Sequence, residues 1–216
     1  MTCAGEGFFM RSDQPLPVAE FRVIVDTMAK GLGRYLRLCG IDTVILQDVD
    51  DRDQAVRMKQ YVARDQCFCL NNVASAREQM KDLLTFYNVA VKENDILTRC
   101  TECNASRYAL VPSEHMRQLQ ESLKDEGQAA TGGKALVRSY GPDCSIDFTS
   151  GRFNNGVLVR CRSLSLEYLS HVETFYVCVA CGKVYWDGSH HGRFRKQLLL
   201  DDLICREPPP GSALVA

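Results

Sequence analysis

The chain has 216 residues, of which 25% are charged, and a formal net charge of −1. The length suits one large or two small domains with a buried core. The near-zero charge excludes nucleic-acid binding through a global basic field, so any such contact must come from local patches. Eleven cysteines without a signal peptide or a long apolar run favour reduced thiols over a disulfide framework. We expect an intracellular protein, cytoplasmic or nuclear to perinuclear, with no membrane partner.

Residues 1–20 mix glycine, proline and acidic side chains without a period and predict a flexible lead-in. From residue 21 onward, short apolar runs alternate with amphipathic stretches. The apolar runs predict strands at residues 21–25, 43–46, 67–70 and 89–91, and the amphipathic stretches predict helices at residues 27–39, 52–66 and 74–87. Strands that alternate with helices are typical of a parallel sheet covered by helices. We therefore predict an α/β domain over residues 21–98.

The first predicted helix contains two internal glycines, Gly31 and Gly33. Each costs a helix roughly 1 kcal/mol relative to alanine, which indicates a close backbone approach at this point. The same helix repeats Lys30, Arg34 and Arg37 at helical spacing, so these cations are predicted to share one face. They could bind phosphates or form an ordinary solvated face.

Residues that do chemistry in parallel sheets gather at the carboxyl ends of the strands. Asp26 follows the first predicted strand. Asp50 and Asp51 lie in the acidic turn after the second, and Asn71 and Asn72 follow the third. Carboxylates at this edge could hold Mg²⁺ or Mn²⁺, but Asp26 could equally be a helix N-cap and the turn simply solvated. The two asparagines bring no negative charge to this edge.

Two C-x-x-C knuckles, Cys100 with Cys103 and Cys178 with Cys181, lie 75 residues apart. Together they supply four thiolates, the number that a closed tetrahedral zinc site needs. The separation is far longer than in a compact zinc ribbon, so the ion would join strand pairs across a long insertion. The sequence therefore predicts one structural zinc ion held by these four cysteines.

The region from residue 99 to 196 is predicted as a zinc ribbon with a long insertion at about 125–160. Its expected elements are a strand at residues 108–112, a helix at 113–125, turn-rich loops or an irregular hairpin at 136–156, a strand at 157–169, a ribbon arm at 175–186 and a short helix at 193–206. Residues 197–216 form the predicted C-terminal tail, disordered in its last ten residues.

The end of the ribbon combines aromatic and basic side chains, which is how single strands are held without sequence reading. The alternative is an aromatic satellite core under the ribbon, and the two histidines could also compete as zinc ligands. The candidate residues for nucleic-acid binding here are Tyr185, Trp186, His190, His191, Arg193, Phe194, Arg195 and Lys196.

The runs VDTMAKGLGRYLRLCGIDT, RCTECN and CGKVYWDGSHHGRF resemble the C-terminal domain of the Nibbler and mutator-seven exoribonucleases. The resemblance covers roughly residues 21–119 and 165–195. It implies a PIN-like α/β fold, a parallel sheet with helices on both faces, to which a zinc ribbon built from the two distant knuckles is attached. It also implies a parent enzyme that trims RNA 3′ ends in small-RNA pathways, with its 3′–5′ exonuclease centre in a separate N-terminal domain.

The chain departs from that family's pattern where bacterial relatives carry a strand that ends in Thr-Arg-Asp, since YVARDQ leads directly into CFCLNN. Three functions remain open. The favoured one is an inactive accessory domain that binds single-stranded RNA for a separate exonuclease domain in RNA silencing. The others are a protein-docking module that recruits the exonuclease to a silencing complex, and an active ribonuclease, which alone would need Mg²⁺ or Mn²⁺.

Overall fold

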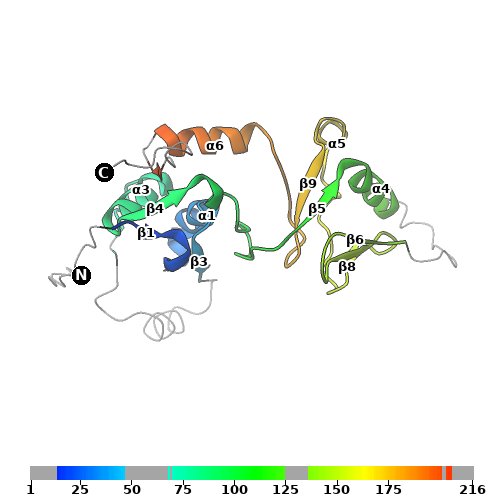
Figure 1. Ribbon diagram of the computed structural model, residues 1–216, viewed down its shortest axis with the longest axis horizontal. Helices are drawn as coiled ribbons and strands as arrows, with labels where there is room; N and C mark the ends of the chain where they lie inside the picture. Colours follow the sequence, from blue (N-terminus) through cyan, green and yellow to red (C-terminus); the bar gives the residue numbers. More distant parts are fainter. Residues whose placement is uncertain (1–13, 47–67, 69, 125–135, 201–202, 206–216) are drawn as a thin grey trace, which may run out of the picture. The chain divides into compact units, whose positions relative to one another are not determined.

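The computed structural model describes residues 14–46, 68, 70–124, 136–200 and 203–205 (Figure 1). These residues form a mixed α/β structure of small sheets and short helices. The chain divides into two compact units. Unit 1 comprises Met1–Asn104 and Arg195–Ala216, and unit 2 comprises Ala105–Phe194.

Unit 1 contains two parallel sheets. β2 (Arg22–Val25) pairs with β3 (Asp42–Ile45), while β1 (Leu16–Pro17), β4 (Val89–Lys92) and β11 (Ile204–Cys205) form a second sheet in the order β1-β4-β11. The helices are α1 (Lys30–Leu38), which follows the 3-10 turn η2 (Thr27–Ala29), and α3 (Ala76–Phe86). The predicted α/β character of this region is confirmed. The described strands form two parallel sheets, and a single PIN-like sheet stays an expectation.

α1 crosses from β2 to β3 and packs tightly against both strands. Leu32 and Leu36 are 1% and 0% exposed. A Cβ atom on Gly33 would lie 2.7 Å from Ile45 Cγ1 and 2.8 Å from Val25 Cγ2. The close approach that the internal glycines indicated is therefore real, and it explains why the helix accepts a residue of low helix propensity.

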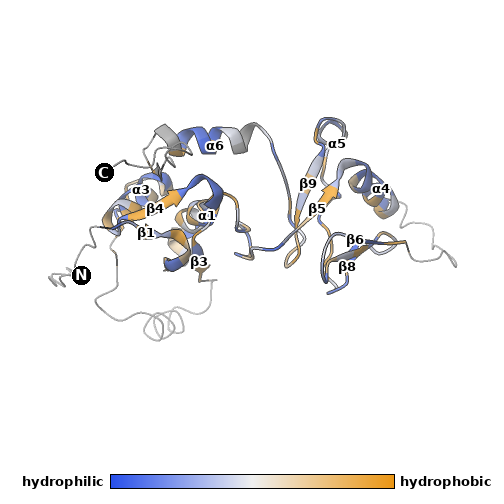
Figure 2. Cartoon of the chain, viewed as in Figure 1, coloured by the Kyte–Doolittle hydropathy of each residue, from blue (hydrophilic) through white to orange (hydrophobic). Residues whose placement is uncertain are grey.

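α3 begins with a capping box and buries one apolar face. Ser75 accepts a hydrogen bond from the Glu78 backbone N–H, and the Glu78 carboxylate accepts one from the Ser75 backbone N–H. Met80 and Leu84 are each 1% exposed, as the helical period predicted. β4 follows directly and is one of the most hydrophobic parts of the chain (orange in Figure 2).

Both ends of unit 1 extend the sheet around β4, which the sequence did not predict. Leu16 pairs with Val89 on one side of β4, and Ile204 pairs with Val91 on the other. The flexible lead-in expected for residues 1–20 and the tail expected for 197–216 therefore each contain a strand. The reason is that β4 leaves open edges that short apolar segments can satisfy.

Two predictions for the middle of unit 1 have different outcomes. The helix expected at residues 52–66 lies outside the described residues. The strand expected at residues 67–70 is wrong for the two residues that are described there, since Phe68 and Leu70 lie in no strand. Phe68 instead contacts the aromatic rings of Phe86 and Tyr87, with ring centroids 5.1 and 6.0 Å away.

Unit 2 contains two antiparallel sheets. β5 (Tyr108–Pro112), β9 (Thr174–Cys178) and β10 (Val184–Trp186) form one in the order β10-β9-β5, and β6 (Val137–Ser139), β7 (Ser145–Asp147) and β8 (Arg152–Phe153) form the other. The helices are α4 (Ser113–Lys124) and α5 (Leu166–His171), and α6 (Ser189–Leu200) follows β10. No described helix is long and apolar enough to cross a membrane.

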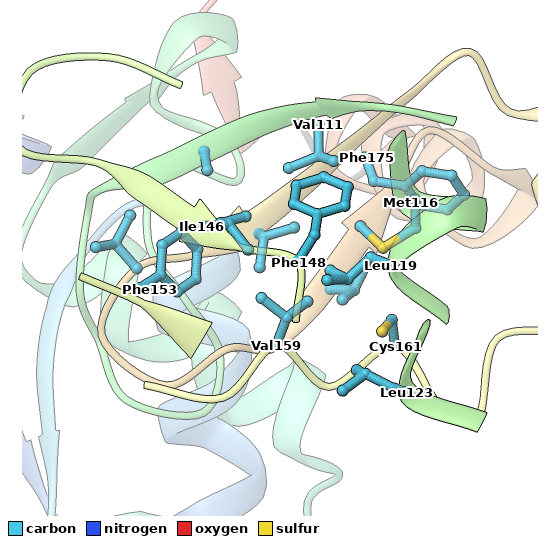
Figure 3. Close-up of a cluster of buried hydrophobic side chains, with 14 of the residues drawn as sticks. Val111, Met116, Leu119, Leu123, Ile146, Phe148, Phe153, Val159, Cys161 and Phe175 are labelled. Atoms are coloured by element: carbon cyan, nitrogen blue, oxygen red, sulfur yellow. The ribbon is translucent and has the colours of Figure 1, made fainter. Parts of the chain in front are cut away.

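The core of unit 2 draws side chains from every layer of the unit (Figure 3). Val111 and Phe175 come from the β10-β9-β5 sheet, and Met116 and Leu119 come from α4. Phe148 joins them from the segment after β7, within the long insertion expected at about 125–160. The described part of that insertion is therefore a folded sheet that shares the core.

The strand expected at residues 157–169 is wrong. Only Leu158 forms a bridge, to Arg152, and the chain then turns into α5. The cause is Ser165, whose hydroxyl accepts from the Tyr168 backbone N–H and caps a helix in place of a strand.

Candidate metal centre

Four cysteines form a compact cluster of sulfur atoms. The Sγ atoms of Cys100, Cys103, Cys178 and Cys181 all lie within 4.8 Å of one another. Cys100 and Cys178 are buried, Cys181 is half-buried and Cys103 is exposed. The two knuckles, 75 residues apart in the sequence, thus come together as their spacing predicted.

The second knuckle is the turn between β9 and β10. The Cys178 backbone N–H donates to Lys183 O over 2.9 Å, and the Gly182 N–H donates to Cys178 O over 2.8 Å. Gly182 has a φ of +74°, and a Cβ atom there would lie 1.8 Å from Leu158 O. Only glycine satisfies both the left-handed conformation and the close approach. Backbone contacts of the chain itself therefore define the conformation of this turn.

The first knuckle is held by Asn104. Its backbone N–H closes the turn onto Cys100 O over 2.9 Å. Its side-chain Oδ1 accepts from the Thr43 backbone N–H over 3.1 Å, and its Nδ2 donates to Asp42 Oδ1 over 2.6 Å. The φ of Asn104 is +69°, a conformation that asparagine tolerates better than most residues. Asn104 thus ties the knuckle to β3.

Arg37 also holds the first knuckle, which corrects the prediction that it shares an exposed face with Lys30 and Arg34. Arg37 is 5% exposed. Its Nε donates to Thr43 O over 2.9 Å, and one terminal nitrogen donates to the carbonyls of Thr101 and Glu102 over 3.0 and 2.8 Å. The helical period was right, but the knuckle covers the end of the helix where Arg37 lies.

The other two cations of α1 remain on the surface. Lys30 is exposed. Arg34 is exposed as well and forms an ion pair with Glu102 over 3.7 Å. Arg99, which no sequence pattern singled out, donates to Gly40 O and Asn104 O, each over 3.1 Å. The signal that could have found it is its place directly before the first cysteine.

Four thiolates are a donor set that Zn²⁺ takes in closed, tetrahedral sites, and iron takes the same set. Bonds of about 2.3 Å in a tetrahedron separate the sulfurs by roughly 3.8 Å, so a cluster within 4.8 Å fits with small movements. These four cysteines could therefore hold a metal ion such as zinc. Among the residues that the structure describes, no other group of three or more histidine, cysteine or acidic side chains could do so.

The candidate acids of the strand ends have ordinary roles where they are described. Asp26 caps η2, since its carboxylate accepts from the Met28 backbone N–H and the Thr27 hydroxyl over 3.4 and 2.8 Å. Asn71 makes a similar turn with the Val73 N–H over 3.0 Å. Asp50 and Asp51 lie outside the described residues.

Trp186 and Tyr185 lie on opposite faces of the β10-β9-β5 sheet. Trp186 packs against the core of unit 2, with its ring centroid 4.7 Å from that of Tyr168 and 6.2 Å from that of Phe175. Tyr185 is half-buried on the other face and contacts Tyr108. The alternative of an aromatic core under the ribbon is therefore correct for Trp186 but not for Tyr185.

The basic residues at the end of the ribbon lie in α6 and are exposed where their side chains are described. Arg193, Arg195 and Lys196 are exposed, and Arg195 pairs with Glu93. Phe194 is half-buried. For His190 and His191 the structure describes only the backbone, as part of α6.

Comparison with known proteins identifies relatives over most of the chain. The chain is 29% identical to the human protein named "Exonuclease mut-7 homolog", over 90% of this chain and 28% of that protein. It is 30% identical to "Exonuclease mut-7" of Caenorhabditis elegans, over 47% of this chain and 14% of that protein. The chain therefore spans less than a third of the human relative's length.

The Mut7-C RNAse domain matches residues 21–132 and 158–198. The matched ranges include both cysteine knuckles, α1 and the β10-β9-β5 sheet, so they contain every residue that forms the candidate metal centre. Only the segment at residues 133–157 interrupts them. The chain belongs to the Mut7-C RNAse domain family.

Proposed function

We propose that the chain is a zinc-containing accessory domain of a 3′–5′ exoribonuclease, which binds single-stranded RNA and does not itself cut it. The observation that carries the proposal is the donor set of the metal centre. Four thiolates fill a tetrahedral site and leave no position for a water molecule or substrate. Such a site stabilises a fold, so the contribution of this domain to RNA metabolism is binding.

Exposed cations supply the contact with phosphates in this proposal. They are Lys30 and Arg34 on α1 and Arg193, Arg195 and Lys196 on α6. The pairs of Arg34 with Glu102 and Arg195 with Glu93 are exposed, and exposed pairs contribute only about 0–1 kcal/mol. RNA phosphates can therefore replace these carboxylates at little cost.

The strand-end residues support binding over cleavage. A nuclease of this fold needs several carboxylates on one or two Mg²⁺ ions. Asp26 is engaged as a cap, and Asn71 offers no negative charge. The relatives' names support an association with an exonuclease. We further propose that the domain acts in small-RNA silencing, in the cytoplasm or around the nucleus, together with a protein partner.

An electrophoretic shift series tests the proposal with the full chain, single-stranded and duplex RNA, and Mg²⁺ present or absent. We expect binding of single strands with little sequence preference and no cleavage. If three to five phosphates are neutralised, log affinity should fall against log salt with a slope of about −2 to −4. The Arg193→Glu, Arg195→Glu double variant should weaken binding to all sequences alike and leave the zinc content unchanged. No retardation of any RNA would refute the proposal.

A metal-dependent ribonuclease is the second candidate, because the family is described as an RNAse domain. The same series separates the two functions. Degradation that requires Mg²⁺ or Mn²⁺ and disappears in Asp26→Asn would establish the second candidate in place of the first.

A further inference from the structure

The β10-β9-β5 sheet carries a row of large side chains on the face turned away from the core. Tyr176 in β9 pairs with Leu110 of β5 on one side and with Tyr185 of β10 on the other. Residues in direct register lie on one face of a sheet, since side chains alternate along each strand. Leu110 is 56% exposed and both tyrosines are half-buried, so this face meets solvent.

The next row of the same face adds a third tyrosine and a cation. Tyr108 pairs with Cys178, two residues after Tyr176, and its ring meets that of Tyr185 edge to face with centroids 5.9 Å apart. The Lys183 ammonium lies 5.6 Å from the centre of the Tyr185 ring. A cysteine of the candidate metal centre thus lies opposite Tyr108, at one end of the tyrosine array.

The core does not account for these tyrosines. Val111 and Phe175 alternate with them along β5 and β9 and lie on the inner face, and Trp186 packs there too. The inner face is therefore complete with aliphatic and aromatic side chains that belong to the buried cluster. Tyr108, Tyr176 and Tyr185 lie on the other side of the sheet.

Basic residues border the end of the face at the second knuckle. Arg160 is exposed, and its backbone N–H donates to Gly182 O over 2.8 Å. Arg107 is exposed too, but its guanidinium donates to Pro142 O over 3.1 Å, and as the residue before Tyr108 it points to the other face of the sheet. Lys183 therefore supplies the positive charge next to the tyrosines, and Arg160 lies beside the same turn.

We propose that this outward face is a stacking surface for the bases of single-stranded RNA, with Tyr108, Tyr176 and Tyr185 as the platform. The inference rests on the proposed RNA binding and adds to its phosphate contacts a surface for the bases, which does not include Trp186. Aromatic rings on a sheet with cations at its border suit a chain of bases and phosphates, because every base has a π-face. A surface that docks a protein usually exposes more aliphatic side chains, whereas Leu110 is the one leucine described on this face.

The test uses the full chain and two fluorescent 12-nucleotide strands, an oligoadenylate and the same strand with abasic sites at alternate positions. Tyr108→Leu and Tyr176→Leu keep apolar bulk and remove the ring. Each should weaken oligoadenylate binding by roughly 5- to 100-fold and change the salt slope little. Neither should alter binding of the abasic strand much, since the lost interaction is with bases.

Tyr168→Leu is the matched control, because Tyr168 is an exposed tyrosine of the same unit that lies on α5. It should bind both strands as the unaltered chain does. Zinc content and thermal midpoint should be the same for all variants, which shows that the fold is retained. A Tyr108→Leu or Tyr176→Leu variant that has lost its zinc is replaced by Tyr185→Leu, which should show the same loss of oligoadenylate affinity.

The outcomes separate the two proposals. If the unaltered chain binds RNA and the leucine variants bind the oligoadenylate equally well, stacking on this face is refuted while RNA binding stands, and protein docking becomes the next hypothesis for the face. If the unaltered chain binds neither strand, the proposed function itself has failed.

Discussion

Arg37 shows how one buried cation can organise the knuckle that carries Cys100 and Cys103, two cysteines of the candidate metal centre. Its guanidinium bridges β3 and the first knuckle by donating to the carbonyls of Thr43, Thr101 and Glu102. A buried charge is costly unless it is fully hydrogen-bonded, and removal of such a group leaves its acceptors without partners. The knuckle should therefore depend on this side chain for its conformation.

Arg37→Ala should lower the free energy of unfolding of the chain by about 2–4 kcal/mol, since three hydrogen bonds from a charged donor are lost. It should also weaken metal binding. Arg34→Ala is the control, because it removes only an exposed ion pair with Glu102 and should cost no more than about 1 kcal/mol. Denaturant unfolding of both variants measures the difference. Equal effects would contradict the role of Arg37.

His115 should make the stability of the chain depend on pH. Burial and the nearby charge of Arg138 lower the pKa of His115. Arg138 can only donate, so His115 Nε2 must accept its hydrogen bond, and Nδ1, 3.0 Å from the Tyr140 hydroxyl, carries the proton of the neutral ring. Protonation would place a second positive charge beside Arg138.

Since the folded pKa lies below that of the unfolded chain, the unfolded chain binds the proton first as the pH falls. The free energy of unfolding should therefore decrease from about pH 6.5 downward, until the lowered pKa is passed. The His115→Gln variant removes the titration and should show a shallower pH dependence. Urea midpoints between pH 7.5 and 5 test this, and identical slopes for both chains would exclude the effect.

At the scale of elements, unit 2 depends on two features whose residues tolerate little substitution. They are the turn of the second knuckle and the β6-β7-β8 sheet. The turn depends on a left-handed residue packed against the Leu158 carbonyl. The small sheet lies entirely outside the family match, which stops at residue 132 and resumes at 158, yet Ile146, Phe148 and Phe153 belong to the core. The segment at residues 133–157 therefore contributes a sheet that packs on the core of unit 2.

Gly182→Ala should destabilise the chain by more than the roughly 1–3 kcal/mol that a strained backbone conformation costs, because its Cβ would also overlap Leu158 O. Gly156→Ala is matched to it. Gly156 has a φ of +83°, and a Cβ atom there would have no neighbour within 4 Å. The difference between the two thermal midpoints therefore reports the steric contact alone. A Gly156→Ala variant as damaged as Gly182→Ala would show that the contact is unimportant.

Phe148→Ala should lower the free energy of unfolding by about 3–5 kcal/mol, the usual loss for a buried phenylalanine. Phe148 is 2% exposed and lies in the segment that the family match leaves out. Val137→Ala in the same segment, where the side chain is 58% exposed, should change stability by no more than about 0.5 kcal/mol. If both substitutions are nearly neutral, the segment is an appended loop that the core does not need.

At the scale of the whole molecule, the cysteine cluster brings together stretches 75 residues apart in the sequence. Closing a loop of this length costs conformational entropy, which the contacts around the cysteines must offset when no ion is bound. A bound ion adds a large free energy, about 10–16 kcal/mol of apparent binding in zinc-finger peptides. The stability of the chain should therefore be linked to the metal.

Protein purified without chelator should contain one equivalent of zinc, and its removal should lower the thermal midpoint sharply. Cys178→Ser should abolish zinc binding, whereas Cys161→Ser should retain the full equivalent because the buried Cys161 lies outside the cluster. Burial raises the pKa of the Cys161 thiol to about 11, so it remains protonated. Metal analysis decides the matter, and a content below half an equivalent would rule out a stable zinc site.

The sequence by itself determined the features that are encoded locally. The C-x-x-C spacing identified all four cysteines of the cluster, because a knuckle is a turn of consecutive residues. The helical period identified the buried positions of α1 and α3, and the paired glycines of α1 indicated its close packing. These patterns need no knowledge of what lies opposite them in space.

The tertiary structure alone decided which of several equivalent side chains meets solvent. Arg34 and Arg37 follow the same helical period, yet Arg37 is buried because the knuckle lies over its end of the helix. Tyr185 and Trp186 are neighbours on one strand, and only the position of the core shows which is outward. Burial depends on partners distant in the chain, whereas local patterns report only the period of the element that carries the residue.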